Sequence, residues 1–154
     1  MNAGSPTANA YLRTKVLTAS PEELRLMLLD GAIRFATQGR DGLARKDYEA
    51  SYNGMSQCRN IIIELITSIR PDVDPELAQR VRSVYTFMFS ELVEASFQKD
   101  PARVDEVLRL LNYERETWAM LMGKLAQGRA GDAPPAAPRP ASAQAKPAAF
   151  SVEA

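Results

Sequence analysis

The side chains best suited to chemistry are two pairs of adjacent acids and one cysteine, and the sequence contains no histidine. The absence of histidine excludes the usual general base, the Ser-His triad and a di-iron site of the Glu-x-x-His kind. Both acid pairs, Glu22/Glu23 and Asp105/Glu106, fall in the first turn of a predicted helix. Negative charge there offsets the helix dipole, so we interpret both pairs as structural. The residues therefore predict no enzyme, no cofactor and no metal site.

The remaining reactive or charged residues indicate packing rather than catalysis. Cys58 falls on an apolar helix seam, which favours a packed small side chain over a nucleophile. Arg59 and Arg115 lie on apolar faces, where each is expected to reach solvent or to pair with a glutamate. There is no Gly-rich phosphate loop, and the 19 Lys and Arg residues equal the 19 Asp and Glu residues. This balance gives no attraction for nucleic acid or for an anionic membrane.

The sequence is typical of a cytoplasmic protein. A single cysteine excludes an intrachain disulfide. The first residues, MNAGSPTANAYLRTK, contain no apolar core of a signal peptide. No apolar run approaches the roughly 18 residues that a membrane span needs.

Proline-led helix starts divide the chain. Ser20-Pro21, Asp74-Pro75 and Asp100-Pro101 each place a capping side chain before a proline that suits the first helical position. Asp47 is a fourth start. Apolar residues then recur at helical spacing, and short connections make consecutive helices antiparallel. We predict an all-α fold, an antiparallel up-down four-helix bundle over residues 20–127, with helices at roughly 21–45, 47–69, 75–98 and 101–127.

Two segments flank this predicted domain. Residues 1–19 contain apolar side chains but no helix start that we recognise, so an extended segment that could cover a groove is expected. Residues 128–154 are rich in proline and alanine, and they contain half of the ten prolines of the chain. This composition predicts a disordered tail. Phe150 and Val152 are either a short docking motif or part of an inert tail.

The predicted helices have more apolar surface than a small bundle needs. The apolar sweep of helix 21–45 covers roughly 200°, against the 100° or so of an ordinary surface helix. The excess is either core at a crowded position or a surface for a partner. Several more apolar side chains fall outside the predicted core stripes, which suggests a helix-binding groove: Leu26, Leu29, Ile33, Phe87, Phe97, Tyr113 and Met120.

The opening of this domain resembles a known signature. The run from Thr18 to Leu24 (TASPEEL), with Tyr11 and Val16 before it, resembles the start of the flagellar secretion chaperone family, FliS. The resemblance spans about residues 9–125 and departs from the family at Leu29, at Cys58-Arg59 and in the added tail. Weaker similarities continue along the chain: Met27-Leu28, Asp30-Gly31-Ala32, Ile61-Ile62, Glu64-Leu65, Tyr85, Leu110-Leu111, Arg115-Glu116 and Trp118.

The resemblance implies a cytosolic chaperone that binds the C-terminal segment of flagellin. The chaperone would prevent premature polymerisation and keep flagellin competent for flagellar type III secretion. It also implies that the N-terminal tyrosine region covers part of the groove. For contact with client or cover we select six residues, the last four of which could equally be core: Tyr11, Val16, Leu29, Ile33, Tyr85 and Phe89.

Other readings remain open at this point. The chain could be a structural or regulatory helical-bundle adaptor that self-associates or binds another flagellar export protein, such as the export apparatus or a regulator. An enzyme acting through carboxylates alone would need two acids in an apolar pocket, and no such internal pair is evident. The chain is expected to be a monomer or a weak homodimer.

Overall fold

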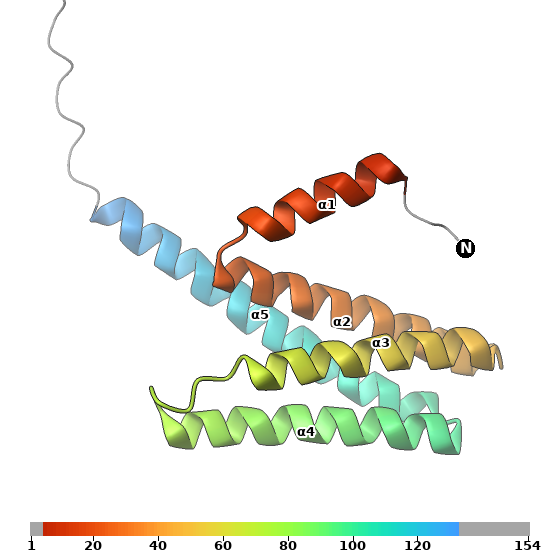
Figure 1. Cartoon of the computed structure of the whole chain (residues 1–154). Helices are drawn as coiled ribbons and strands as arrows, with labels where there is room; N and C mark the ends of the chain where they lie inside the picture. The colour runs from red at the N-terminus through yellow and green to blue at the C-terminus, as the bar shows by residue number, and fades with distance from the viewer. Residues whose placement is uncertain (1–4, 133–154) are drawn as a thin grey trace, which may run out of the picture.

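The computed structural model describes residues 5–132, and this part of the chain is all-helical (Figure 1). The predicted all-α class is therefore confirmed for the described residues. No helix among them is long and apolar enough to cross a membrane. The five helices are α1 (Pro6–Thr18), α2 (Pro21–Ala44), α3 (Tyr48–Thr67), α4 (Pro75–Gln98) and α5 (Pro101–Gly131).

The helices begin where the sequence places capping residues. The Ser20 hydroxyl accepts a hydrogen bond from the backbone N–H of Glu23, and the Glu23 carboxylate accepts one from the N–H of Ser20. This reciprocal pair is a capping box, which satisfies two backbone donors at the start of α2. The carboxylates of Asp47, Asp74 and Asp100 cap α3, α4 and α5, each by accepting one hydrogen bond from a backbone N–H of the first turn. The four predicted starts are thus confirmed.

Helices α2 to α5 pack around one core, and consecutive helices run in opposite directions (Figure 1). Helix α2 packs against α3 and α5, and α4 also packs against α3 and α5. Each of the four therefore has two neighbours. The largest fully buried side chains come from all four helices: Leu29, Met55, Ile62, Leu65, Tyr85, Met88, Leu92 and Leu111.

The wide apolar sweep of α2 is explained by its two neighbours. Leu29, Ala32 and Ala36 are fully buried because α3 covers one flank of α2 and α5 covers the other. Helix α3 approaches especially closely at Gly39 and Gly54, since a Cβ on Gly54 would lie 2.6 Å from the backbone nitrogen of Gly39. For Leu29 the crowded-core reading is therefore correct, and the surface reading is wrong.

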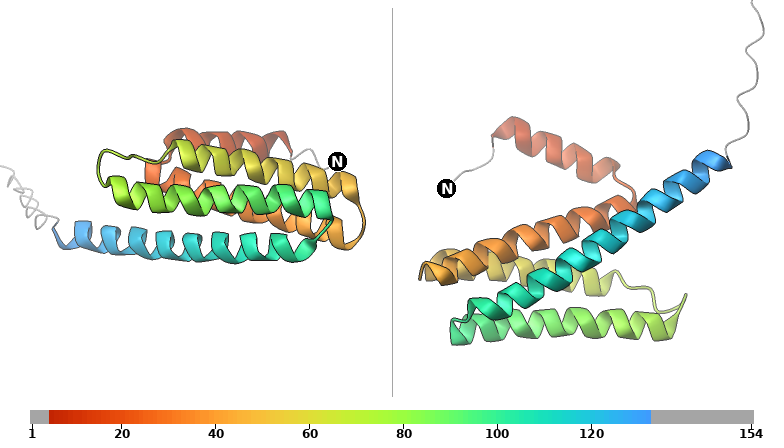
Figure 2. Two further views of the ribbon diagram at one scale, coloured as in Figure 1. Left: turned by 90° about the horizontal axis from the view of Figure 1, so that it is seen from below. Right: turned by 180° about the vertical axis from the view of Figure 1, so that it is seen from behind.

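The N-terminal segment differs from the prediction, because it is helical rather than extended. The Ser5 hydroxyl accepts a hydrogen bond from the N–H of Ala8, and Pro6 occupies the first helical turn. The pair Ser5-Pro6 is the same start signal as Ser20-Pro21, and it was missed because no apolar stripe follows it. Helix α1 buries none of its residues and extends away from α3 and α4 (Figures 1 and 2).

The last helix is longer than predicted and continues past the ends of its neighbours (Figure 2). Residues 128–131, which we assigned to the tail, form the last turn of α5. The composition changes at residue 128, but the first helix-breaking proline comes only at Pro134. Residues 133–154, including the predicted docking motif at Phe150 and Val152, lie outside the described residues.

Candidate functional site

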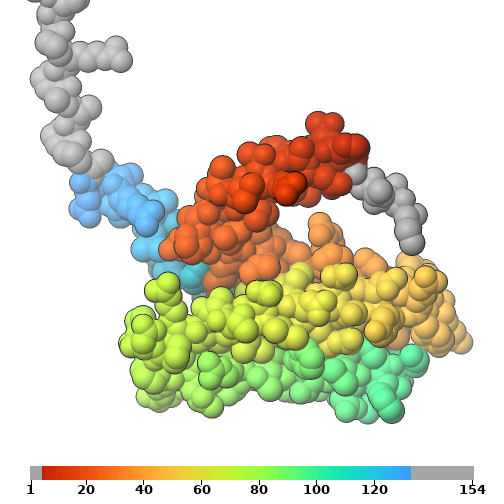
Figure 3. Space-filling model, viewed as in Figure 1, coloured from red at the N-terminus to blue at the C-terminus, as the bar shows by residue number. Residues whose placement is uncertain are grey.

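Apolar side chains remain exposed on α1 and on both flanks of α4, although the core is complete. The space-filling view shows the outer face of α3 and α4 without another helix over it (Figure 3). The predicted exposure of Phe87, Phe97, Tyr113 and Met120 is confirmed, and Phe97 is the extreme case at 86%. The other exposed large apolar residues are Tyr11, Leu12, Val16, Leu17, Tyr48, Tyr52, Ile63, Val73, Leu77, Val84, Val93, Leu121 and Leu125.

One apolar strip follows the junction of α3 and α4. The Ser96 hydroxyl lies 3.5 Å from the sulfur of Met55, which shows which flanks of the two helices meet. Tyr52 and Ile63 of α3 lie three turns apart on the solvent side of this junction, and Val93 projects beside them from α4. We call Tyr52, Ile63 and Val93 the α3/α4 strip.

A second strip follows the junction of α4 and α5. Arg103 of α5 pairs with Glu91 of α4 at 2.9 Å, which fixes the flanks that face one another. Val84 and Phe87 lie on this flank of α4, within two turns before Glu91. Tyr113 of α5 precedes Glu114, which bonds to Tyr85 of α4, and is 69% exposed. We call Val84, Phe87 and Tyr113 the α4/α5 strip.

The six residues predicted for partner contact fall into three groups. Tyr11 and Val16 are exposed on α1. Ile33 and Phe89 are partly buried at the edge of the core. Leu29 and Tyr85 are fully buried, so a partner could reach them only if the helices separated. The structure therefore does not bring the six side chains together on one open surface.

A partly buried polar cluster lies beneath the start of α2. Arg25 donates a hydrogen bond of 2.8 Å to the hydroxyl of Tyr85, which donates one of 2.8 Å to Glu114. The Arg25 guanidinium also lies over the ring of Trp118, 5.1 Å from its centroid, and donates to the Ser68 hydroxyl at 3.4 Å. The indole N–H of Trp118 donates to the carbonyl of Glu22 at 2.9 Å. These contacts join α2 to the end of α3 and to the middle of α4 and α5.

Burial raises the pKa of two core side chains, Tyr85 and Cys58. Desolvation raises the pKa of Tyr85, and the positive charge of Arg25 opposes this rise only in part. Desolvation also raises the pKa of Cys58 to about 12. A thiol that stays protonated at neutral pH is a poor nucleophile, which agrees with the packing role predicted for Cys58. Within the described residues, no group of three or more His, Cys, Asp or Glu side chains could hold a metal ion.

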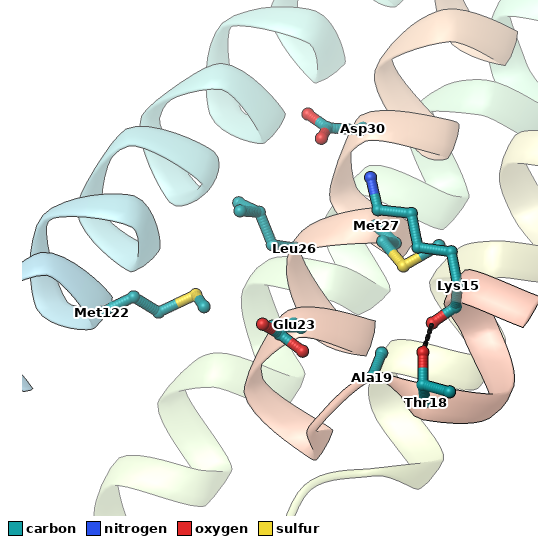
Figure 4. Close-up of a pocket in the computed structure, with 8 residues that line it drawn as sticks. All are labelled: Lys15, Thr18, Ala19, Glu23, Leu26, Met27, Asp30 and Met122. Atoms are coloured by element: carbon teal, nitrogen blue, oxygen red, sulfur yellow. Dashed lines mark hydrogen bonds between the residues drawn. The ribbon is translucent and has the colours of Figure 1, made fainter. Parts of the chain in front are cut away.

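A cleft of about 540 Å³ separates α1 from α2 and α5 (Figure 4). Leu26 of α2 and Met122 of α5 lie on either side of it, and Met27 forms part of its wall. Lys15 extends along the cleft from α1, and the acids Glu23 and Asp30 of α2 line it. The cleft is thus lined by apolar side chains and by charged side chains of both signs.

Two more cavities, of about 760 and 290 Å³, adjoin the polar cluster at the connection between α3 and α4. Arg25, Ser68, Arg70 and Trp118 line both of them. The larger cavity also has apolar walls from Leu24 and Leu28 of α2. Trp118 therefore forms a shared boundary between the two cavities.

Comparison with known proteins identifies the family. The family model for flagellar protein FliS matches residues 3–125 of the chain. The chain belongs to the FliS family. It is 29% identical over 109 residues to the flagellar secretion chaperone FliS of Bacillus subtilis, across 71% of this chain and 80% of the relative. It is 29% identical over 118 residues to that of Salmonella typhimurium, across 76% and 87% respectively. FliSB of Pseudomonas aeruginosa is 26% identical over 118 residues, across 77% and 94%.

The FliS family is a family of flagellar secretion chaperones, so this chain belongs to a chaperone family and not to an enzyme family. The predicted resemblance is thereby confirmed. The signature at the start of α2 has a structural role in this FliS protein, since Ser20 and Glu23 build its capping box.

Sequence reasoning missed the polar centre of this FliS protein. Arg25 is the only charge within the apolar sweep of α2, and that isolation was the available signal for a buried partner. Its partner Tyr85 was selected as a contact residue, whereas Glu114 was not considered. Arg115, expected to pair with a glutamate within the helices, instead forms an ion pair with Asp30 at the exposed edge of α2.

Proposed function

We propose that this FliS protein is a cytoplasmic export chaperone for the C-terminal segment of flagellin. Binding would keep the apolar segment from polymerising before export through the flagellar type III apparatus. The FliS family match supports the coarser part of this proposal, a chaperone of flagellar export. The finer part, flagellin as the client, rests on the surface described above and on the family resemblance.

The observation that carries the proposal is the pair of apolar strips on either side of α4. A monomer with a complete core gains nothing from exposing Tyr52, Ile63, Phe87 and Tyr113 together. Grooves between adjacent helices accept amphipathic helices, whose apolar residues recur at spacings of three and four. A client segment that orders on binding could follow one strip, cross α4 and follow the other.

Among the six selected residues, we propose that Phe89 of α4 contacts the client and that Ile33 of α2 contacts the client or the cover, both at the edge of the core. Leu29 and Tyr85 would support the client surface from within, because both are fully buried. The proposed roles therefore differ with the burial of each side chain. Substitution of the edge residues should change client affinity, whereas substitution of the buried pair should change the stability of the fold.

Helix α1 is proposed to cover part of this surface when no client is bound. Its residues Tyr11 and Val16 are exposed, and only Ala19 and Ser20 separate it from α2. A short linker keeps the local concentration of a tethered helix high, so weak contacts are enough for a cover that a client can displace.

Coupled folding accounts for release as well as binding. A segment that folds on the chaperone gains a large contact energy and loses about 2–5 kcal/mol or more to ordering. The net affinity stays moderate, as an export chaperone requires. We propose a 1:1 complex and a free protein that is a monomer or a weak homodimer.

Light scattering coupled to size-exclusion chromatography tests the proposal. The expected result is a 1:1 complex with a peptide of the flagellin C-terminal segment. Phe87→Ser should weaken peptide binding by about tenfold, since a central apolar contact is worth about 1–2 kcal/mol. Val73→Ser is the control, because Val73 is 81% exposed in the connection between α3 and α4, outside both strips. A stable dimer that ignores the peptide would favour the self-associating adaptor instead.

A further inference from the structure

The two cavities at Trp118 have a chemical character that client binding along α4 does not use. Leu24, Leu28 and the ring of Trp118 form an apolar wall in the larger one. Arg70 lines both cavities, is exposed, and forms no ion pair with any residue in the described range. The site thus combines room for an apolar side chain with a cation that has no partner among residues 5–132.

We propose that the C-terminal residues 148–154 of this chain, AAFSVEA, dock in these cavities. Phe150 enters against Trp118, and Glu153 pairs with Arg70. The inference goes beyond the proposed chaperone function, because it concerns a segment of the chain itself and requires no client.

The composition of the tail selects these two residues. Phe150 is the only aromatic residue after Trp118, and Glu153 is the only acid after Asp132. Lys146 precedes Phe150 by four residues, and the larger cavity also has Glu22 and Glu64 on its rim. The order of basic, aromatic and acidic residues in the tail therefore complements a site that carries acids, an apolar wall and Arg70.

The length of the tail matches the distance that it must cover. Helix α5 carries the chain about 20 Å from Trp118 to Gly131, at 1.5 Å per residue. Residues 132–149 then connect Gly131 to Phe150. These 18 residues include five prolines, and a Pro-rich chain extends by about 3.1 Å per residue, so the linker can span up to about 56 Å. Because the linker can cover the required distance, docking is intramolecular, and even weak docking is populated.

Trp118 is the only tryptophan of the chain, so quenching of its fluorescence by acrylamide reports directly on the site. The full-length protein without client is compared with Phe150→Ser, also at full length. If the docking constant is of the same order as the effective concentration, about half of the molecules are docked, and Phe150→Ser should raise the quenching constant about 1.5- to 2-fold. Phe97→Ser is the control and should leave quenching unchanged.

A charge exchange tests the proposed ion pair separately. Arg70→Glu should raise quenching in the same direction as Phe150→Ser, and the double variant Arg70→Glu/Glu153→Arg should restore the protection. Far-ultraviolet circular dichroism confirms that each variant keeps its helices.

Equal quenching in the native protein and in Phe150→Ser overturns the docking, as does failure of the exchanged pair to restore protection. Protection that increases with protein concentration also overturns it, because the occupant would then be the tail of a second copy. Since no flagellin is present in these measurements, their failure would leave the chaperone proposal untouched.

Discussion

The phenol of Tyr85 donates a hydrogen bond of 2.8 Å to the carboxylate of Glu114, from the middle of α4 to the middle of α5. Arg25 of α2 donates to the same phenol oxygen. Val84 and Tyr113, the neighbours of Tyr85 and Glu114 in sequence, belong to the α4/α5 strip. This partly buried hydrogen bond therefore sets the register of the two helices whose outer flanks carry that strip.

Replacement Tyr85→Phe should destabilise the fold by about 1–3 kcal/mol. The loss of the hydroxyl leaves Arg25 and Glu114, both partly buried, without their shared partner, and buried groups without partners are costly. Urea denaturation measures the change. Tyr113→Phe is the control, since Tyr113 is exposed and its loss of a hydroxyl should have almost no effect. Equal stability of the two variants would contradict the structural role of the cluster.

Stability should decrease from pH 9 upward because of Cys58. Burial raises the pKa of this thiol from 9.0 to about 12 in the folded state, so the unfolded chain releases the proton first. The contribution of the protonated Cys58 thiol to the free energy of unfolding is complete below pH 9. It is lost as the pH rises towards 12, at about 1.4 kcal/mol per pH unit. The raised pKa of Tyr85 adds a second loss of the same sign above pH 10.

Urea denaturation between pH 9 and 10 isolates the cysteine. Cys58→Ala should lower the stability at neutral pH and flatten the pH dependence in this interval, while the decline above pH 10 remains. A native protein whose stability is constant from pH 8 to pH 10 would show that the thiol is not buried as described.

Replacement by alanine should change the stability of the fold in opposite directions at two helical glycines, Gly54 and Gly123. A Cβ on Gly54 would lie 2.6 Å from the carbonyl oxygen of Phe35 and 2.6 Å from the nitrogen of Gly39, so α2 and α3 would have to move apart. Gly54→Ala should therefore destabilise by about 1–3 kcal/mol. Gly123 of α5 has no atom within 4 Å of such a Cβ, and Gly123→Ala should stabilise by about 0.5–1 kcal/mol. Thermal unfolding of both variants tests the pair; a stable Gly54→Ala would contradict the close approach.

Helix α1 should exchange its amide hydrogens far faster than α2. None of its residues is buried, and a short helix without tertiary packing opens readily. Hydrogen exchange followed by mass spectrometry measures the protection of residues 6–18 against that of residues 21–44. Protection of α1 as strong as that of α2 would contradict a weakly held cover that a client can displace.

Sequence patterns predicted where the helices begin and end better than they predicted which helices pack against one another. Capping side chains followed by proline located α2, α4 and α5 because the signal is local. The same signal at Ser5-Pro6 was overlooked, since no apolar stripe supported it. The last turn of α5 was missed because a change in composition was taken for a helix end, although no proline occurs between Pro101 and Pro134.

The surface of the site could be predicted only in part. The exposure of Phe87, Phe97 and Tyr113 followed from their distance from the core stripe of each helix. Leu29 and Tyr85 could not be placed, because a helical wheel gives the width of an apolar face and not the number of helices that cover it. The position of Arg25 depends on contacts with α4 and α5, which lie far away in sequence.

The central claim is that a folded set of helices keeps an apolar surface for a flagellin segment. Calorimetric titration of the full chain with the flagellin C-terminal peptide, at several temperatures, tests it most directly. Binding is expected at a 1:1 ratio with a large negative heat-capacity change, because apolar surface is buried as the peptide folds. Absence of binding, or binding without a heat-capacity change, would contradict it.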